Sequence, residues 1–479
     1  MKKNTKRILI PCAAAALTIG ASMMSYAATG WVEEGGSWYY QSSDGDRVTD
    51  TWKKSGDHWF WLDEDGEMLT DSLVEDDGDF YYVNEAGARV ANEWRELENT
   101  DDSDDGADTA WYYFGANGKA YKAASSGKTT FKSIGKADGS TKKYAFDSEG
   151  RMLYGWVNEE SERLTDEDAW RSGVYYLGEN GDGALSANQW QRLDVEDDTS
   201  EDDNFDGYYW FYFSSNGKKV KDTTKTINGR KYRFREDGNA EFNWYLKASS
   251  STASESNIYY NEPDQCWQAS GWFKTVPGEN IDPEAYENDE AYWFYALKDG
   301  DVVKSQIKKI NGYYYGFNEK GEMLEGLYKL SMDDKEIVSY EEIETENDLS
   351  EEGDGWDVYY FGNSPKDGVM KTGKTTINLD GEDFTYNFRK SGSDRGAGYD
   401  GIYEDSIYIK GRLLKADRDA KLEAVAYGEE GNEYLINTAG KIQKKKTNVK
   451  DADDRYYCTD SEGVIIYKGN EKWDKNKDE

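Results

Sequence analysis

A spacing of 21 residues governs the first part of the chain and limits what the chain can fold into. Three series of residues share this interval: Trp31, Trp52, Leu73 and Trp94; Trp38, Trp59 and Phe80; and Gly45, Gly66 and Gly87. Strict self-similarity at a fixed period is the signature of a repeat architecture. Fold and function must therefore arise from one short unit that is copied many times.

Each unit reads as a β-hairpin. An aromatic triplet such as Trp38-Tyr39-Tyr40 is followed by a polar turn that ends in glycine, as in Ser42-Ser43-Asp44-Gly45. Glycine accepts the positive φ that closes such a loop. Similar turns recur as far as Gly463, which gives about fourteen hairpins. Because one hairpin is marginal alone in water, the hairpins must stack, and we predict an all-β, elongated β-hairpin repeat solenoid with acidic loop insertions.

Changes in the pattern divide the chain into four segments. Residues 1–27 combine basic residues, an apolar stretch and a small-residue cleavage site, which together predict a secretory signal peptide. Residues 28–94 hold the regular 21-residue repeats, and residues 95–397 hold longer repeats with acidic insertions. In residues 398–479 tryptophan almost disappears and lysine increases, which predicts divergent C-terminal repeats and a cap.

Charge and hydropathy restrict the partners. The formal net charge of −38 argues against nucleic acid and anionic membrane as ligands and favours cationic ligands or simple solubility. After the opening segment, no run approaches the ~18 apolar residues that a membrane span needs. We therefore expect a secreted protein without a transmembrane segment, held to a cell only by what it binds.

Catalytic chemistry finds little support in this sequence. The single histidine, His58, nearly excludes a Ser/His/Asp triad and any zinc site that needs two histidines. Carboxylates cluster in solvated runs such as Asp101-Asp102-Ser103-Asp104-Asp105, where nothing evident raises their pKa. We expect a protein that is not an enzyme and has no cofactor. The sequence leaves calcium binding undecided for this run and for Asp197–Asp203, although neither segment matches the EF-hand loop.

The aromatic pattern is the strongest indication of a site. In a strand, the first and third residues of a triplet share a face while the middle residue points the other way. Trp38 and Tyr40 therefore project together, and Trp31 is expected to join them from a preceding turn. Slots walled by three aromatics would recur between stacked hairpins, and an aromatic cage recognises quaternary ammonium ions. The candidate ligand-binding residues are Trp31, Trp38, Tyr40, Trp52, Trp59, Trp61, Met68 and Tyr82.

Methionine adds to this interpretation. Met68, Met152, Met323 and Met370 each follow a hairpin glycine by two residues. A polarizable thioether beside aromatic walls suits the floor of a cage. The alternative is that aromatics and methionines only fill the core of the solenoid. At any single position the sequence supports the two interpretations equally. The repetition of the pattern at hairpin junctions favours ligand binding.

These elements resemble a known family. Gly30-Trp31, the triplet Trp38-Tyr39-Tyr40 and Gly66-Glu67-Met68 are similar to the cell-wall-binding repeat, also called the choline-binding repeat. The resemblance implies a β-hairpin solenoid that attaches secreted bacterial proteins to the envelope through choline on teichoic acids. Related repeats bind glucans or host glycans instead.

Carried onto this chain, the resemblance implies two best-matching cages. One would combine Trp31 with Trp38 and with Trp59 or Trp61, and the other would combine Trp52 with Trp59 and Tyr82, with Met68 alongside. Arg47 and Arg89 depart from the pattern because they take the methionine position. A cation at a cage floor would oppose a choline ligand.

Two hypotheses follow. The first is a non-enzymatic protein at the bacterial cell surface or cell wall, whose cages bind teichoic acid choline or a similar envelope ligand. The second is a glycan-binding adhesin that uses the same aromatic repeats and binds an envelope glycan. The sequence does not choose between the ligands and does not give the oligomeric state.

Overall fold

The structure is a computed structural model that describes residues 29–99, 107–197, 207–247, 256–345, 348, 355–362, 368–428 and 431–474. The predicted signal peptide therefore lies outside the described residues. The chain divides into two compact units, residues 1–227 with 232–241 and residues 228–231 with 242–479. The boundaries predicted after residues 94 and 397 stay predictions.

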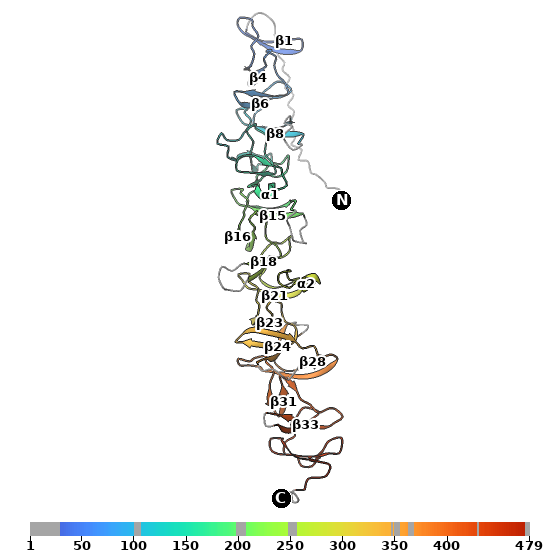
Figure 1. Cartoon of the computed structure of the whole chain (residues 1–479). Helices are drawn as coiled ribbons and strands as arrows, with labels where there is room; N and C mark the ends of the chain where they lie inside the picture. Colours follow the sequence, from blue (N-terminus) through green and yellow to red (C-terminus); the bar gives the residue numbers. More distant parts are fainter. Residues whose placement is uncertain are drawn as a thin grey trace. The chain divides into compact units, whose positions relative to one another are not determined.

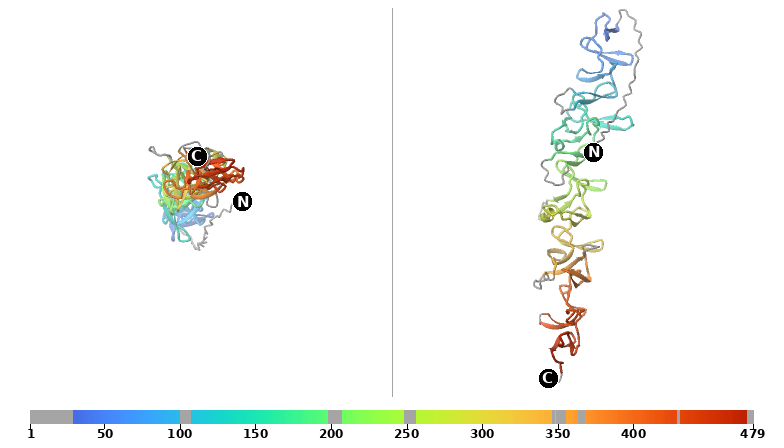
Figure 2. Two further views of the ribbon diagram at one scale, coloured as in Figure 1. Left: turned by 90° about the horizontal axis from the view of Figure 1, so that it is seen from below. Right: turned by 90° about the vertical axis from the view of Figure 1, so that its right-hand side faces the viewer.

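The first unit is a succession of antiparallel hairpins, seen from β1 to β15 in Figure 1 and again in the blue-to-green ribbon of Figure 2. The pairs are β1 (Gly30–Glu34) with β2 (Ser37–Gln41), β3 (Thr51–Ser55) with β4 (His58–Leu62), β5 (Ser72–Asp76) with β6 (Asp79–Val83), β7 (Glu93–Glu98) with β8 (Thr109–Phe114), β9 (Lys132–Gly135) with β10 (Thr141–Tyr144), and β14 (Gln189–Asp194) with β15 (Tyr208–Phe213). Between the last two pairs, β11 (Trp156–Val157), β12 (Arg163–Leu164) and β13 (Tyr175–Tyr176) form a three-stranded sheet that carries the short helix α1 (Ala169–Ser172). The hairpin of β16 (Thr223–Ile227) and β17 (Arg230–Phe234) lies where the division falls.

The second unit begins with the same kind of hairpin and ends in larger sheets. Its two opening pairs are β18 (Trp244–Lys247) with β19 (Ser256–Tyr259) and β20 (Gly271–Thr275) with β21 (Tyr292–Ala296), with helix α2 (Pro283–Glu287) between the last two strands. A six-stranded sheet contains β22 (Gln306–Ile310), β23 (Tyr313–Phe317), β24 (Gly326–Asp333), β25 (Glu336–Glu342), β26 (Asp357–Gly362) and β27 (Val369–Met370), and a five-stranded sheet contains β28 (Gly373–Leu379), β29 (Glu382–Phe388), β30 (Gly401–Tyr403), β31 (Ser406–Ile409) and β32 (Arg412–Leu413). The unit closes with β33 (Leu422–Tyr427), β34 (Asn432–Asn437), β35 (Val449–Lys450), β36 (Tyr456–Thr459) and β37 (Ile465–Gly469).

The predicted all-β fold built from repeated hairpins is confirmed. Within the described ranges the strands form fourteen sheets, ten of which are two-stranded. Both α1 and α2 lie in segments that the sequence marks as acidic insertions, so the insertions lengthen the hairpins without replacing them. Among the described residues no helix is both long and apolar enough to cross a membrane.

In each of the two units, one backbone hydrogen bond joins successive hairpins in the same register at several junctions. The residue two positions after a turn glycine donates its N–H to the carbonyl of the first triplet residue of the preceding hairpin: Met68 to Trp38 (2.8 Å), Arg89 to Trp59 (2.8 Å), Met152 to Trp111 (2.7 Å) and Met323 to Trp293 (2.8 Å). We call this residue the floor residue. Because the bond uses backbone atoms only, the floor side chain can vary while the hairpins keep their stacking.

The turn glycines serve this stacking in two ways. Gly87 has a φ of +75°, which L-residues rarely adopt, and a Cβ placed on it would lie 2.8 Å from Cε of Met68. Gly118 bears the same relation to Arg89, since its Cβ would lie 2.6 Å from Nε. Each floor side chain therefore packs directly under the glycine of the next turn, in space that a methyl group would fill.

A pair of alanine substitutions separates these two roles. Gly78 at the tip of the β5–β6 hairpin has a φ of +73° and no atom within 4 Å of an added Cβ, so Gly78→Ala tests backbone strain alone. We expect Gly78→Ala to cost about 1–2 kcal/mol and Gly87→Ala to cost roughly 1–3 kcal/mol more, because its methyl group also collides with Met68. Hydrogen exchange of the amides in β3 to β6 measures both. Equal losses of protection in the two variants would contradict the stacking role.

Candidate functional site: aromatic cages between hairpins

The best-formed site lies where the β20–β21 hairpin meets β23. Its walls are Trp272 on β20, Trp293 on β21 and Tyr315 at the centre of β23, and its floor residue is Met323. The ring centroids of Trp272 and Tyr315 lie 4.7 Å apart with planes at 67°, and those of Trp272 and Trp293 lie 6.4 Å apart at 87°. Steeply inclined rings on three sides enclose a small volume. We call this group the Met323 cage.

Strand pairing explains how the first two walls meet. Trp272 lies opposite Tyr295, and Trp293 lies opposite Lys274, two residues further along β20. Trp272 and Trp293 are therefore diagonal neighbours on the same face of the hairpin, a relation that brings large side chains into contact. Trp293 remains 38% exposed, so this cage opens to solvent.

Two more cages in the first unit repeat the arrangement. The Met68 cage consists of Trp31, Trp38, Phe60 and Met68, and the Met152 cage consists of Trp94, Trp111, Tyr144 and Met152. Trp31 and Phe60 lie 5.3 Å apart at 72°. Trp94 lies 4.9 Å from Tyr144 at 66° and 6.5 Å from Trp111 at 73°.

In another cage, a cation from the chain itself occupies the centre. Trp52, Trp59 and Tyr81 form its walls, and the floor residue is Arg89. The guanidinium carbon lies 5.3 Å from the Trp52 ring centroid, 5.6 Å from that of Trp59 and 5.7 Å from that of Tyr81. All three distances fall within the ~6 Å range of a cation–π interaction. We call this group the Arg89 cage.

Lys219 is the floor residue of a further site, the Lys219 cage, with walls Trp156, Phe211 and Trp170. Its Nζ lies 5.1 Å from the Trp156 ring centroid and 5.8 Å from that of Phe211, and it donates hydrogen bonds to the backbone carbonyls of Trp170 (2.5 Å) and Arg171 (3.0 Å). All four of these cage residues are buried, because the insertion that contains α1 covers the site. Burial, together with a smaller contribution from the nearby positive charge of Lys221, lowers the pKa of Lys219 to about 7.

The last cage has a small floor residue. Trp190, Trp210 and Tyr232 have the same relation as the other walls, with Trp190 6.4 Å from Trp210 and 4.7 Å from Tyr232, and Ala240 donates its N–H to the Trp210 carbonyl at 2.8 Å. One wall arrangement is thus combined with Met, Arg or Ala as floor residue, whereas the Lys219 cage takes Trp170 of α1 as one of its walls.

The structure brings together some of the candidate residues and separates others. Trp31, Trp38 and Met68 share a cage, but its third wall is Phe60, where the sequence suggested Trp59 or Trp61. The reason is that stacked hairpins meet through opposite faces. The next hairpin therefore presents the middle residue of its triplet.

The second predicted cage changes for the same reason. Trp52 and Trp59 do share a cage, but its third wall is Tyr81 and not Tyr82, and Arg89 fills it. Trp31 and Trp52 also lie on strands β1 and β3, whereas the sequence suggested that they join from turns.

Three candidate residues lie outside the cage walls. Tyr40 and Trp61 are the direct cross-strand partners of Trp31 and Trp52, which they support from the side. Tyr82 is buried, its hydroxyl donates a hydrogen bond to Asp71, and burial raises its pKa to about 12. The missed walls Phe60 and Tyr81 carry a signal in the sequence, since each is the middle of a triplet, and Arg89 lies at the methionine position where the sequence placed it.

Such a cage can hold a cation without a counter-ion. Indole, phenol and phenyl faces attract a cation through their quadrupoles, and a quaternary ammonium offers no hydrogen-bond donor that the rings would leave unsatisfied. Metal binding has no comparable basis: among the described residues no group of three or more His, Cys, Asp or Glu could hold an ion. The calcium candidates lie outside the described residues except Asp197, whose carboxylate pairs with Arg171 at 2.6 Å.

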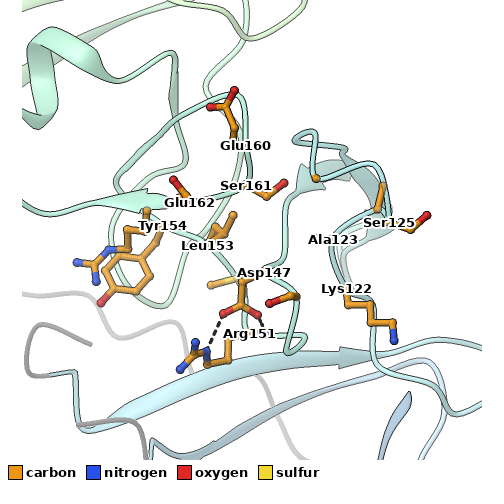
Figure 3. A pocket seen from close by; sticks show the side chains of 15 residues that line it. Lys122, Ala123, Ser125, Asp147, Arg151, Leu153, Tyr154, Glu160, Ser161 and Glu162 are labelled. Atoms are coloured by element: carbon orange, nitrogen blue, oxygen red, sulfur yellow. Dashed lines mark hydrogen bonds and ion pairs between the residues drawn. The ribbon is translucent and has the colours of Figure 1, made fainter. Parts of the chain in front are cut away.

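A polar cavity of about 670 Å³ lies beside the turn that carries Met152 (Figure 3). Asp147 and Arg151 form an ion pair along its edge, with Nε and Oδ2 2.7 Å apart. Ser161 is only 7% exposed, and its Oγ has no hydrogen-bond partner. In Figure 3 this hydroxyl points toward the loop of Ala123 and Ser125. A buried hydroxyl without a partner in a polar cavity suits a ligand rich in hydrogen-bonding groups.

Sequence comparison gives these repeats a family. The chain matches the cell wall binding repeat over residues 29–46, 50–68 and 108–120, which include the walls Trp31, Trp38, Trp52, Trp59 and Trp111 and the floor Met68. The predicted resemblance is thereby confirmed, and the chain carries repeats of this family. No curated protein sequence matches the chain.

Several solved structures that resemble the chain come from Streptococcus pneumoniae. CbpJ is 17% identical, with a TM-score of 0.38 over 78% of this chain and 100% of CbpJ. The modular autolysin LytC is 16% identical, with a TM-score of 0.35 over 64% of this chain and 55% of LytC, so this chain spans about half the length of that autolysin. The choline-binding domain of CbpL is 22% identical, with a TM-score of 0.31 over 50% of this chain and 98% of that domain.

The buried Lys219 predicts a pH dependence of stability. Its pKa is lowered from 10.5 to about 7 in the folded chain, so between these pH values the unfolded state binds a proton that the native state lacks. The native state should therefore gain up to about 1.4 kcal/mol per pH unit as pH rises from 7 toward 10. Urea unfolding across this range measures the slope. Lys219→Met should remove that component and the neighbouring Lys218→Met should keep it, so equal slopes in the two variants would refute the assignment.

Proposed function

We propose that this chain, which carries cell wall binding repeats, is exported and attaches to the bacterial cell wall by holding choline groups in its Met68, Met152 and Met323 cages. One observation carries the proposal: the same wall arrangement surrounds the chain's own cation at Arg89 and a neutral methionine in three other places. The Arg89 cage is direct evidence that a cation fits between such rings.

Side-chain length supports an external cation in the methionine cages. Cδ and Nε of Arg89 pack under Gly118, and Sδ and Cε of Met68 pack under Gly87 in the same way. The methyl group of methionine thus ends where Nε of arginine stands, one atom short of the guanidinium carbon. The place among the rings that the guanidinium takes in one cage is left to a ligand in the others.

Several weak sites on one chain favour attachment to a polymer. A single cation–π contact contributes about 0.5–1 kcal/mol when exposed and about 2 kcal/mol when desolvated. Sites that engage one choline-bearing polymer together raise avidity by roughly 10²–10⁴. The net charge of −38 attracts the choline cation and repels teichoic phosphate. Because both effects are screened by ions, binding to the polymer should depend on the salt concentration. We assign no catalytic step to the described residues.

Wall substitutions test the proposal. Trp38→Ala, Trp111→Ala and Trp293→Ala each remove one wall from a methionine cage and should weaken choline binding there about tenfold, since a well-packed cation–π wall contributes on the order of 1–2 kcal/mol. The triple variant should lose retention on choline-agarose. Tyr313→Ala is the control, because Tyr313 is 46% exposed on β23 but is not a cage wall. A folded triple variant retained as strongly as the wild type would exclude the cages as the choline sites.

A glycan is the second candidate ligand, and the polar cavity of Figure 3 favours it. Tyr154 and Arg163 stack on one side of this cavity at 3.7 Å, and the Ser161 hydroxyl, with charged groups around it, offers hydrogen bonds to sugar hydroxyls. This cavity contains none of the cage walls, but Met152 lines it as well as forming the floor of the Met152 cage. The chain would then act as an adhesin for envelope or host glycans.

Ser161→Ala tests the glycan candidate. Removal of this buried hydroxyl should weaken binding of a soluble glucan oligomer about tenfold, because a lost hydrogen bond in a buried site costs on the order of 1–2 kcal/mol. Choline binding should not change. Tryptophan fluorescence titrations measure both ligands, with Ser125→Ala at the exposed rim of the cavity as the control. A wild-type chain that does not respond to the glucan would count against this candidate.

A further inference from the structure

Arg89 occupies the position that methionine occupies in the three methionine cages. Its N–H bonds to the Trp59 carbonyl at 2.8 Å, as the N–H of Met68 bonds to that of Trp38. Its aliphatic stem packs under the next turn glycine, as those of the methionines do. The difference begins only beyond Nε, where the guanidinium enters the space among Trp52, Trp59 and Tyr81.

The rings are the main partners of this guanidinium. Among the described residues no carboxylate pairs with Arg89 and no acceptor receives a hydrogen bond from its side chain. Arg47, which follows the turn glycine Gly45 two turns earlier, behaves differently: its guanidinium pairs with Glu34 at 2.5 Å while it lies over Tyr39. The Asp76 carboxylate near the Arg89 cage accepts a hydrogen bond from Nε1 of Trp52 at 3.1 Å. This bond holds the Trp52 wall in place, and the guanidinium of Arg89 contacts the rings instead of this carboxylate.

The Arg89 cage is also open to solvent. Trp59 is 36% exposed, close to the 38% of Trp293 in the Met323 cage. The Lys219 cage contrasts with it, since Trp156, Trp170 and Phe211 are all buried and Lys219 is bound to two backbone carbonyls. Both cages hold a basic side chain of the chain itself, but only the Arg89 cage has an entrance.

We propose that Arg89 is a tethered ligand: its guanidinium occupies a cage that would otherwise bind an external quaternary ammonium ion, and it thereby removes one site from the array. This inference rests on the proposed function of the methionine cages. It follows that the floor residue two positions after each turn glycine decides whether a junction binds a ligand, while the walls and the stacking stay the same.

The number of bound choline molecules tests this inference. Equilibrium dialysis of the full chain should give one more bound choline per chain for Arg89→Met than for the wild type, and one fewer for Met68→Arg. Lys219→Met is the matched control, with the same substitution at the same repeat position, and should leave the number unchanged because its cage is closed. A wild-type chain that binds choline while Arg89→Met gains no site would overturn the inference.

A second measurement separates this inference from the proposed function. Arg89→Ala should lower the melting temperature of the first unit, because three rings lose their cation. Tetramethylammonium or choline should then raise the melting temperature of Arg89→Ala more than that of Lys219→Ala. If the ammonium ion restores the melting temperature of Arg89→Ala but the wild type binds no choline, the tethered-ligand inference stands and the proposed wall-binding function is wrong. If neither ion raises the melting temperature of a folded Arg89→Ala variant, the tethered-ligand inference is wrong.

Discussion

The structure depends on one constraint, the register in which each hairpin stacks on the one before it. A backbone N–H two residues after the turn glycine reaches the carbonyl of the first triplet residue of the preceding hairpin, and this bond recurs from Met68 to Met323. The glycine of the following turn then covers the floor side chain. Because a lone hairpin cannot bury enough surface to be stable, this repeated contact supplies the core that the single units lack.

The same junction forms the cage, so the floor residue serves both the stacking and the cage, but through different atoms. The backbone of the floor residue maintains the stack, and its side chain determines what the cage holds: a neutral thioether at Met68, a guanidinium at Arg89, an ammonium at Lys219. Walls and stacking tolerate all three. An insertion adds a second control, because the segment that contains α1 closes the cage of Lys219 to solvent.

Much of the fold and part of the site could be predicted from the sequence. The period of 21 residues, the aromatic triplets and the turn glycines are local features, so the hairpins followed from strand and turn chemistry. The grouping of Trp31 with Trp38 was also accessible, although Met68 was expected beside Trp52. The third walls were not: Phe60 and Tyr81 were assigned away from the site because they point to the opposite face of their own hairpin, and only the stacking of one hairpin's front on the next one's back makes that face part of a cage.

The sequence by itself determined the repeated unit, the all-β class and the family of the repeats, because these depend on residues close together in the chain. The tertiary structure decided which rings face one another, that Tyr40 and Trp61 support the cages from the side, and that Arg89 fills a cage that stays open beside Trp59. These outcomes depend on the register between successive hairpins. They also depend on side-chain length, because the Met68 side chain ends at the position of Arg89 Nε and the guanidinium carbon extends beyond it. A spacing along the chain does not contain that information, since it fixes where a side chain begins and not which neighbour it meets.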